Sequence, residues 1–445
     1  MQKFVIVGGD AAGMSAAMQI VRRLPDASVV ALEMGDTFSY AQCGLPYYIG
    51  GDIPETDNLI ARSAETFRNK YGIDARTYHK VTKIHPSEKT VDFINMQSGE
   101  AGTVPYDRLL IATGARPVVP EWEGIDLQGV FVLKTIRDAE RIREYVRNGE
   151  VNKCVIIGGG PIGIEMAEAL SASEKKVTIL DRNPQLATAW NSEIAEIAKQ
   201  HMEENGVLVK PEQNVKGIVG QNGKAAAVET ESETLEADLV LLAVGVAPNS
   251  ELAKDAGVQL GVRNAIQVNA RMETNLPGIY AAGDVAVHYH RVKKKDDYIP
   301  LGTTANKQGR IAGINMSGEQ AAFAGIVGSA VMKVFELGLA RTGLSRKEAE
   351  DLGMEVEVVT INTKDHAGYY PNAEDLSIQL IVEKSAGQLV GGQAAGKSGA
   401  DKRVDVLATA LYHELTVHEL LDLDLTYAPP FNGVWDPIQQ AARRF

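Results

Sequence analysis

The stretch Lys153-Cys154-Val155-Ile156-Ile157-Gly158-Gly159-Gly160-Pro161-Ile162-Gly163 decides the fold. An apolar run typical of a buried parallel strand leads into a complete G-x-G-x-x-G turn. The sequence then predicts a helix from Ile164 to about Ser173 and a strand over 177–180, which ends at Asp181. In such a unit the glycines let the backbone approach a pyrophosphate at the helix N-terminus, and the acid accepts hydrogen bonds from a ribose. The stretch therefore predicts a dinucleotide-binding Rossmann unit.

A second copy of this pattern begins the chain. A strand over 4–7 leads into Gly8-Gly9-Asp10-Ala11-Ala12-Gly13, followed by a helix to about Arg23 and a strand from Ser28 to Glu33. Asp10 replaces the middle glycine, so this copy taken alone is also compatible with an ordinary strand–turn–helix. Two copies in one chain predict two bound dinucleotides.

Three further strand ends carry glycine. Ala112-Thr113-Gly114 and Ala243-Val244-Gly245 follow apolar runs after each βαβ half, and Gly283-Asp284 ends a third run. Asp284 can accept hydrogen bonds from a polyol chain. A helix from about 301 to 316 is predicted next.

Composition narrows the class of protein. The chain has 445 residues, a net charge of −13 and two cysteines. This length predicts several domains, and the acidic balance argues against a nucleic-acid-binding protein. Two cysteines exclude a disulfide framework and fit a reducing cytoplasm. We see no signal peptide, no run of about 18 apolar residues that would span a membrane, and no metal-ligand spacing.

One of the two cysteines lies in the segment Ser39-Tyr40-Ala41-Gln42-Cys43-Gly44-Leu45-Pro46-Tyr47-Tyr48. Pro46 and the following Gly50-Gly51 predict a short helix with Cys43 at its N-terminal end. A helix N-terminus stabilises a thiolate, so we expect Cys43 to have a lowered pKa and to act as a nucleophile. The alternative is a buried, inert cysteine, which is our interpretation of Cys154.

The pattern changes after Gly325. Strands are predicted over 328–339, 355–363, 376–383 and 388–392, and helices over 404–413 and 417–421. We interpret 325–445 as a separate α+β domain, preceded by units at 1–114, 115–248 and 249–324. The charged stretch 293–297 is expected to be a solvated loop.

Taken together, these motifs resemble the single-cysteine branch of the flavin-dependent pyridine nucleotide-disulfide reductases, over nearly the whole chain. The branch includes coenzyme A-disulfide reductases, NADH oxidases and peroxidases, and persulfide reductases. The resemblance implies an α/β, glutathione-reductase-like fold with two Rossmann-like domains and a C-terminal α+β dimerisation domain. FAD would bind 1–114 and 249–324, and NAD(P)H would bind 115–248. Implied cofactor contacts are Gly8, Asp10, Ala11, Ala12, Gly13, Glu33, Val81, Ala112, Thr113, Gly114, Gly158, Gly160, Pro161, Ile162, Gly163, Asp181, Gly245, Gly283, Asp284 and Ala305.

Two departures from family patterns indicate the chemistry. Tyr48 stands where a C-x4-C pair would place a second cysteine, so Cys43 must work with a substrate sulfur or as a sulfenic acid. Oxidase and peroxidase members carry a histidine in the first glycine turn, where this chain has Ala11. The second departure favours a disulfide reductase.

The resemblance also implies contacts with coenzyme A. Ser15, Gln19 and Arg22 share one helix face by spacing, and the alternative is a solvated face. Local positive charge for the 3′-phosphate of coenzyme A would come from Arg22, Arg23, Arg62, Arg68 and Lys70. Further implied substrate contacts are Ser39, Gln42, Asn306 and Trp435.

Tyr369 and Tyr427 match tyrosines that, in coenzyme A-disulfide reductases, reach the active site from the partner subunit. A phenol can donate a proton to a leaving thiolate, whereas the alternative for both residues is packing at a dimer interface.

The sequence thus predicts a cytoplasmic, homodimeric FAD enzyme that reduces coenzyme A disulfide through a Cys43–S–S–coenzyme A mixed disulfide. Asp181 favours NADH, and the neighbouring Arg182 leaves NADPH open. The alternatives are a per- or polysulfide reductase, an NADH oxidase, and a redox-sensing flavoprotein that uses Cys43 as a switch.

Overall fold

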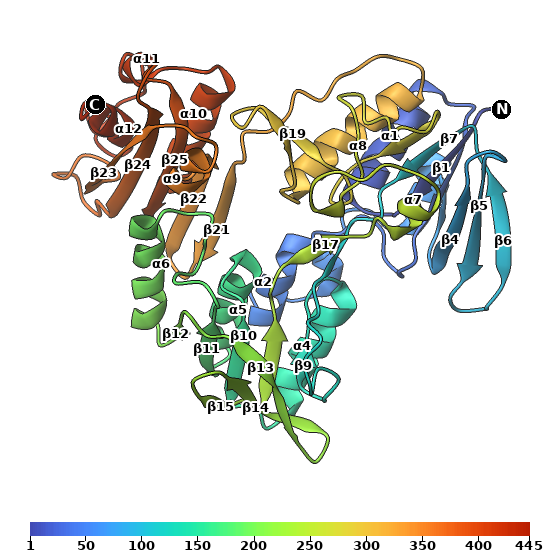
Figure 1. The fold of residues 1–445 in the computed structure, drawn as a ribbon, viewed down its shortest axis with the longest axis horizontal. Coiled ribbons are helices and arrows are strands. Elements are labelled where there is room, and N and C mark those ends of the chain that lie inside the picture. Colours follow the sequence, from blue (N-terminus) through green and yellow to red (C-terminus); the bar gives the residue numbers. More distant parts are fainter.

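A computed structural model describes residues 1–445 and shows three bodies, each built on a five-stranded sheet (Figure 1). The first sheet has the order β18-β7-β1-β2-β3, and its strands are parallel. They are β1 (Lys3–Val7), β2 (Ser28–Leu32), β3 (Asp74–Arg76), β7 (Arg108–Ile111) and β18 (Ile279–Ala281). The helices α1 (Ala11–Arg23) and α8 (Gly302–Met316) pack against each other beside this sheet.

The second sheet repeats this plan. Its order is β12-β11-β10-β16-β9, again parallel. The strands are β9 (Val130–Phe131), β10 (Lys153–Ile157), β11 (Lys176–Leu180), β12 (Leu208–Lys210) and β16 (Leu239–Leu242). Its helices are α4 (Ile136–Asn148), α5 (Pro161–Ala172) and α6 (Ser192–Glu204). Two strand–glycine turn–helix units with parallel sheets confirm the predicted fold class.

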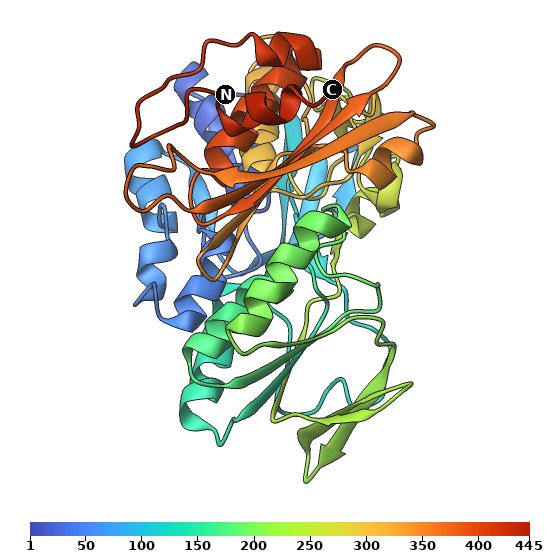
Figure 2. The ribbon, with the colours of Figure 1, turned by 90° about the vertical axis from the view of Figure 1, so that its left-hand side faces the viewer.

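The third sheet is antiparallel, with the order β21-β22-β25-β24-β23, and it lies across α6 (green in Figure 2). The strands are β21 (Ala330–Val334), β22 (Leu337–Gly343), β23 (Val356–Lys364), β24 (Asp375–Glu383) and β25 (Leu389–Gly396). Its helices are α9 (Arg346–Glu350), α10 (Ala400–Tyr412), α11 (Val417–Leu421) and α12 (Pro437–Ala442). The single strand predicted over 328–339 is wrong, because the chain turns at Phe335, which has φ +53°, and forms a hairpin.

Shorter strands and helices connect these bodies or pack on their surfaces. The strands β8 (Ala115–Pro117) and β17 (Val246–Pro248) pair where the chain enters and leaves the second sheet, at the positions proposed as unit boundaries. Small antiparallel sheets comprise β4 (His79–His85), β5 (Thr90–Asn95) and β6 (Ala101–Pro105), and β13 (Val215–Gln221), β14 (Lys224–Thr230) and β15 (Thr234–Glu236). The remaining α-helices and strands are α2 (Leu45–Gly50), α3 (Ala64–Tyr71), α7 (Glu251–Asp255), β19 (His288–His290) and β20 (Lys295–Asp297). None of the helices is both long and apolar enough to cross a membrane.

The stretch 293–297 is not simply a solvated loop. The Lys293 ammonium lies 2.7 Å from the Asp297 carboxylate and 2.9 Å from that of Glu348 on α9. Glu348 in turn accepts from Arg341 at 2.7 Å, and Arg341 donates to the carbonyl of Ala189 next to α6. A part-buried charge network therefore links the hairpin β19–β20 to the third sheet and to the segment before α6 in the second body.

Helices α1 and α8 approach closely because glycine lies between them. A Cβ atom on Gly309 of α8 would lie 2.2 Å from the carbonyl oxygen of Ala12 on α1. A Cβ on Gly313 would lie 2.5 Å from the carbonyl oxygen of Ala16. These backbone contacts have no flexible side chain that could give way, so any side chain at Gly309 must separate the helices.

We predict that Gly309→Ala lowers the free energy of unfolding by about 1–3 kcal/mol, the usual cost of overpacking. The measurement is chemical denaturation of the purified protein. Gly302→Ala, on the same helix with no atom within 4 Å of the added carbon, is the matched control and should be neutral or slightly stabilising. Equal midpoints for the two variants would contradict this account of the interface.

Candidate active site

The two glycine turns have the same geometry. Gly8 has φ +110°, and a Cβ there would lie 2.1 Å from the carbonyl oxygen of Ala112. Gly158 has φ +115°, and its Cβ would lie 2.3 Å from the carbonyl oxygen of Ala243. Each turn thus passes directly over the end of the neighbouring strand, and only glycine fits.

An acid closes each turn. The Glu33 carboxylate accepts from the backbone N–H groups of Gly9 and Gly35, both at 2.7 Å, and burial raises its pKa. The Asp181 carboxylate accepts from the N–H groups of Gly159 and Asn183, both at 2.7 Å. Both predicted ribose-binding acids therefore lie beside the second glycine of their turn.

The residues around both turns fit a dinucleotide. No side chain caps the first turn of α1 or of α5, so the N–H groups of these turns are left for a ligand, except at Pro161, which has none. A Cβ on Gly160, at the N-terminus of α5, would meet no atom within 4 Å, which shows open space there. A pyrophosphate at each helix N-terminus would satisfy these donors.

Several of the other predicted cofactor residues lie around the first turn. The Gly283 N–H donates to Gln308 of α8 at 2.9 Å, and a Cβ on Gly283 would lie 2.8 Å from that of Ala12. Ala305, also on α8, would be 3.5 Å from the same atom. Ala112, Thr113 and Gly114 follow β7, and Thr113 exchanges hydrogen bonds with Asn249 at 2.8 Å. The remaining predicted cofactor residues lie elsewhere. Val81 is buried on β4, and Ile162 is exposed at the start of α5. Gly245 follows β16 and has φ +116°.

Cys43 lies in a single 3-10 turn, Gln42–Gly44, directly before α2. The Gln42 amide donates to the Asp10 carboxylate at 2.7 Å, and the Tyr40 N–H donates to it at 3.3 Å. These bonds tie the cysteine segment to the first glycine turn. Burial nevertheless raises the pKa of Asp10 to about 6.

The predicted lowering of the Cys43 pKa is wrong for this chain. Its thiol is accessible to solvent, but the protein around it partly desolvates it and raises its pKa. The carboxylates of Glu165, Asp284 and Asp10 add to this rise, and the Lys134 ammonium opposes it. Desolvation and three nearby carboxylates outweigh the effect of the helix terminus on the thiol pKa. Cys154 is buried, as predicted, and burial raises its pKa to about 12.

The sequence interpretation missed three residues around Cys43. Helix α2 packs against α5, where a Cβ on Gly50 would lie 3.2 Å from the Cα of Ala169. Glu165 lies one turn before Ala169, and burial raises its pKa to about 7. The pKa of Tyr47, on α2, rises to about 12 through burial and the nearby carboxylates. Lys134 lies 3.6 Å from Asp284. Glu165, two positions after the second G-x-G-x-x-G, had the clearest signal.

The predicted substrate residues of α1 lie on its accessible face. Ser15 donates to Asn306 of α8 at 2.7 Å, so the structure brings these two together. Gln19 accepts from Arg23 at 2.6 Å, and Arg22 is exposed. Among the predicted basic residues, Arg23 pairs with Glu319 and Arg68 binds the carbonyl of Ala75. The charged groups of Arg62 and Lys70 lie 6.0 and 5.6 Å from the ring centre of Tyr71. Ser39, a predicted substrate contact before Cys43, has a left-handed backbone with φ +46°.

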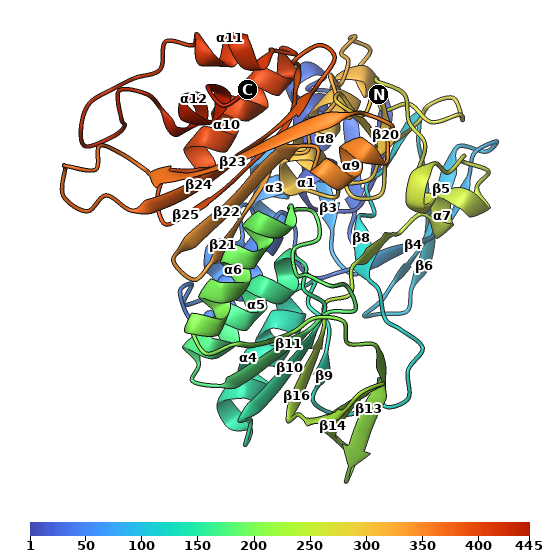
Figure 3. The same ribbon diagram turned by 60° about the vertical axis from the view of Figure 1, so that its left-hand side comes forward.

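Tyr369 and Tyr427 are in contact, with 3.3 Å between their hydroxyl oxygens. They belong to the loop between β23 and β24 and to the loop between α11 and α12, which project together at the left of Figure 3. Both side chains are exposed. Trp435, another predicted substrate contact, follows Tyr427 by eight residues, and the Arg443 guanidinium lies 4.9 Å from the centre of its ring.

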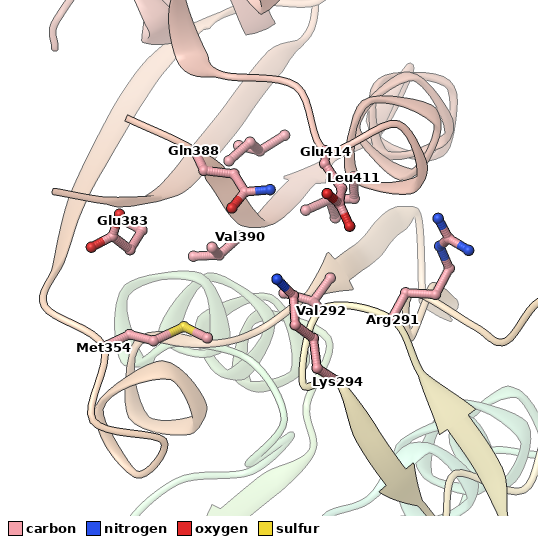
Figure 4. A pocket seen from close by; sticks show the side chains of 10 residues that line it. Arg291, Val292, Lys294, Met354, Glu383, Gln388, Val390, Leu411 and Glu414 are labelled. Carbon is pink, nitrogen blue, oxygen red and sulfur yellow. The ribbon is translucent and has the colours of Figure 1, made fainter. Parts of the chain in front are cut away.

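A separate cavity of about 130 Å³ lies between the β19–β20 hairpin and the third sheet (Figure 4). It is lined by Arg291, Val292, Lys294, Met354, Glu383, Gln388, Leu389, Val390, Leu411 and Glu414. None of the predicted site residues lines it.

Comparison with known proteins decides the family. Residues 2–309 match the family described as pyridine nucleotide-disulphide oxidoreductase, and residues 329–437 match the dimerisation domain of that family. The chain belongs to the pyridine nucleotide-disulphide oxidoreductases. It is therefore an enzyme that uses FAD and NAD(P)H, and its C-terminal body is a dimerisation domain.

The chain is similar to relatives of several named activities. It is 37% identical to the NAD(P)H coenzyme A polysulfide/persulfide reductase of Pyrococcus horikoshii, over 99% of this chain and 98% of that one. It is 32% identical to the NADH oxidase of Methanocaldococcus jannaschii, over 98% and 97%. It is 28% identical to the coenzyme A disulfide reductase of Staphylococcus haemolyticus, over 97% and 96%.

Two solved structures are also similar. One is an NAD-dependent persulfide reductase from A. fulgidus, with 38% identity and a TM-score of 0.97, over all of this chain and 82% of that one. The other is the reduced CoADR-RHD of Bacillus anthracis, with the same identity and TM-score, over all of this chain and 80% of that one.

The carboxylate of Glu165 gives a testable pH effect in this oxidoreductase. Its charge raises the pKa of Cys43, so Glu165→Gln should lower the pH midpoint for iodoacetamide alkylation of Cys43 by roughly half a unit. Glu165 is ionised where the thiol titrates, because its own pKa is about 7.

The measurement uses the NADH-reduced holoenzyme under anaerobic conditions, and Cys43→Ser shows which signal belongs to Cys43. Glu350→Gln, at an exposed position of α9, makes the same charge change far along the chain and should leave the midpoint unchanged. An unshifted midpoint in Glu165→Gln would show that its charge does not act on the thiol.

Proposed function

We propose that this enzyme reduces coenzyme A disulfide with NADH, through a mixed disulfide between Cys43 and coenzyme A. The observation that carries the proposal is a single accessible cysteine held beside the first glycine turn, while the only other cysteine, Cys154, is buried. A lone protein sulfur needs a substrate sulfur to complete a disulfide.

The residues of this chain supply the steps of sulfur exchange. The Cys43 thiolate attacks one sulfur of coenzyme A disulfide, and one coenzyme A thiolate leaves and takes a proton. Two electrons from NADH then cleave the Cys43–S–S–coenzyme A bond and release the second coenzyme A. Bound FAD supplies the hydride-accepting and electron-donating chemistry between nucleotide and sulfur. Lys134, the cation that lowers the pKa of Cys43, would favour the thiolate.

Three features support coenzyme A as the substrate. Ser15 and Asn306 form a joint polar contact on the accessible side of α1 and α8. Positive charge for a phosphate, on an otherwise acidic protein, is provided by Arg22 and by Arg62 and Lys70, which lie near the Tyr71 ring. The Pyrococcus and Staphylococcus relatives carry coenzyme A in their names. Ser39, Gln42 and Trp435 remain proposed contacts, although Gln42 already donates to Asp10.

The proposed cofactor contacts include the acid that closes the second glycine turn. Asp181 is fixed by two backbone N–H groups and is placed to accept from ribose hydroxyls, which favours NADH. Arg182 is exposed next to it and could hold a 2′-phosphate, so we expect some turnover with NADPH. The reducing cytoplasm suits an enzyme whose product is a thiol.

We propose further that the active site is shared across a homodimer. Tyr369 and Tyr427 would assist the leaving sulfur at the partner subunit's Cys43. Their support is the hydroxyl contact of 3.3 Å, their exposure, and their place in the dimerisation domain.

The second candidate is reduction of per- or polysulfides by the same cysteine. It is favoured by the names of the Pyrococcus relative, which is 37% identical, and of the A. fulgidus structure, which is 38% identical. Oxygen reduction is disfavoured because Ala11, in the first glycine turn, has no side-chain hydrogen-bond donor.

The deciding experiment follows anaerobic oxidation of NADH and of NADPH with coenzyme A disulfide, with polysulfide or with no acceptor, and repeats it in air. We expect rapid turnover with coenzyme A disulfide, faster with NADH, and little in air alone. Cys43→Ser should keep its FAD and lose disulfide turnover. Turnover only with polysulfide would select the second candidate, and fast turnover in air alone would contradict the interpretation of Ala11.

The tyrosines give a separate prediction. Tyr427→Phe should lower kcat for coenzyme A disulfide by about ten- to hundredfold, if its hydroxyl protonates the leaving sulfur. Tyr289→Phe, at an exposed tyrosine of β19, is the matched control and should not change kcat. Steady-state kinetics of both variants measure the effect, and wild-type kcat in Tyr427→Phe would remove Tyr427 from the proposed site.

A further inference from the structure

Tyr369 and Tyr427 lie on two separate loops. The contact between their hydroxyl groups is too exposed to fix the loops relative to each other. Tyr369 is 78% exposed and Tyr427 is 47% exposed, so water competes for both hydroxyls. A fixed distance between them needs support from beneath the loops.

Arg403 of α10 supports the first loop. Its side chain is buried, with 2% of the residue exposed. The Nη2 atom donates to the carbonyl oxygen of Asp365 at 2.7 Å and to Oδ1 of Asn432 at 3.2 Å. The Nε atom donates to the Asp436 carboxylate at 3.2 Å. One planar guanidinium thus binds the start of the Tyr369 loop and a side chain of the other segment.

Asn432 supports the second loop. It is 2% exposed, and its amide donates to the carbonyl oxygen of Thr426, directly before Tyr427, at 3.0 Å. The same amide donates to Asp436 at 2.8 Å. Asp436 is 3% exposed, balances the charge of Arg403, and accepts from the N–H of Ile438 at the start of α12. A continuous buried chain of hydrogen bonds therefore joins the backbones of both tyrosine loops.

The surroundings make the bond to Thr426 important. A cavity of about 180 Å³ borders the cluster and is lined in part by Thr426, Asn432 and Arg403. Without the Asn432 amide, the Thr426 backbone has space in which to shift. A lysine in place of Arg403 would keep the charge but lose the planar fork that reaches three partners at once.

We propose that Arg403, Asn432 and Asp436 are positioning residues that set the separation of the two tyrosine hydroxyls and present them as a pair to the substrate sulfur. This inference rests on the proposed role of the tyrosines. The cluster touches neither substrate nor cofactor, and it acts only through the two loops.

The test uses Asn432→Ala in the purified holoenzyme dimer. The matched control is Gln379→Ala, which removes a buried amide of the same domain that donates to the hydroxyl of Thr360 at 2.8 Å and contacts no member of the cluster. Two activities are followed: NADH-dependent reduction of coenzyme A disulfide, and NADH-dependent reduction of ferricyanide, which needs the flavin but not the tyrosines.

Asn432→Ala should lower kcat for coenzyme A disulfide by about tenfold, the scale expected when a reacting group is misplaced. Ferricyanide reduction should stay within about twofold of wild type, and Gln379→Ala should leave both rates unchanged. Combined with Tyr427→Phe, Asn432→Ala should cause no further loss, because both changes remove the same contribution. Arg403→Lys, which keeps the buried charge and hence the fold, should reproduce the selective loss.

Full disulfide turnover in Asn432→Ala and Arg403→Lys would overturn the inference, as would a double variant in which the two losses multiply. If Tyr427→Phe is impaired while both cluster variants are not, only this inference fails. If Tyr369→Phe and Tyr427→Phe are both fully active, the proposed role of the tyrosines fails with it.

Discussion

At Gly8 and Gly158, the carbonyl oxygen of the neighbouring strand lies where a side chain would otherwise be. This close approach sets the whole arrangement of the two nucleotide-binding bodies. It lets each helix begin directly over the end of its sheet, leaves the first N–H groups without caps, and places Glu33 and Asp181 beside the turn. The same steric constraint therefore produces two dinucleotide sites in one chain.

The reactive cysteine depends on both bodies. Asp10 of the first turn binds Gln42 and the backbone of Tyr40, which fixes one side of the Cys43 segment. Helix α2, which follows Cys43, packs on α5 of the second body, so Glu165 acts on the thiol. Glu168, one turn further along α5, pairs with Lys333 and accepts from the N–H of Phe335 at 2.8 Å in the third body. Helix α5 thus contacts both the Cys43 segment and the dimerisation domain, and its own N-terminus belongs to the second nucleotide-binding turn.

Local rules predicted what depends on local sequence. The glycine turns, the acids that close them, and the accessible face of α1 follow from periodicity and from residues at fixed spacing, and the structure shows the same elements. The hairpin at Phe335 was missed because a non-glycine residue adopts φ +53° there. The pairing of Lys293 with Glu348 was missed because the partners lie 55 residues apart and meet only after the third sheet has packed.

The candidate site was predicted less completely than the fold, for the same reason. A helix terminus lowers a thiol pKa in isolation, but the pKa of Cys43 depends on desolvation and on Glu165, Asp284 and Lys134, which belong to distant segments. The cluster around Arg403 likewise gathers residues from α10, the tail and α12, and no single motif marks it.

The central claim is that Cys43 carries coenzyme A during turnover. The most direct measurement is the intact mass of the oxidised protein after incubation with coenzyme A disulfide, before and after titration with NADH under anaerobic conditions. We predict an increase of one coenzyme A per chain, located on Cys43 by peptide mapping, and its release by one equivalent of NADH. An oxidised Cys43 that carries only oxygen or sulfane sulfur, with no coenzyme A adduct during turnover, would contradict the account.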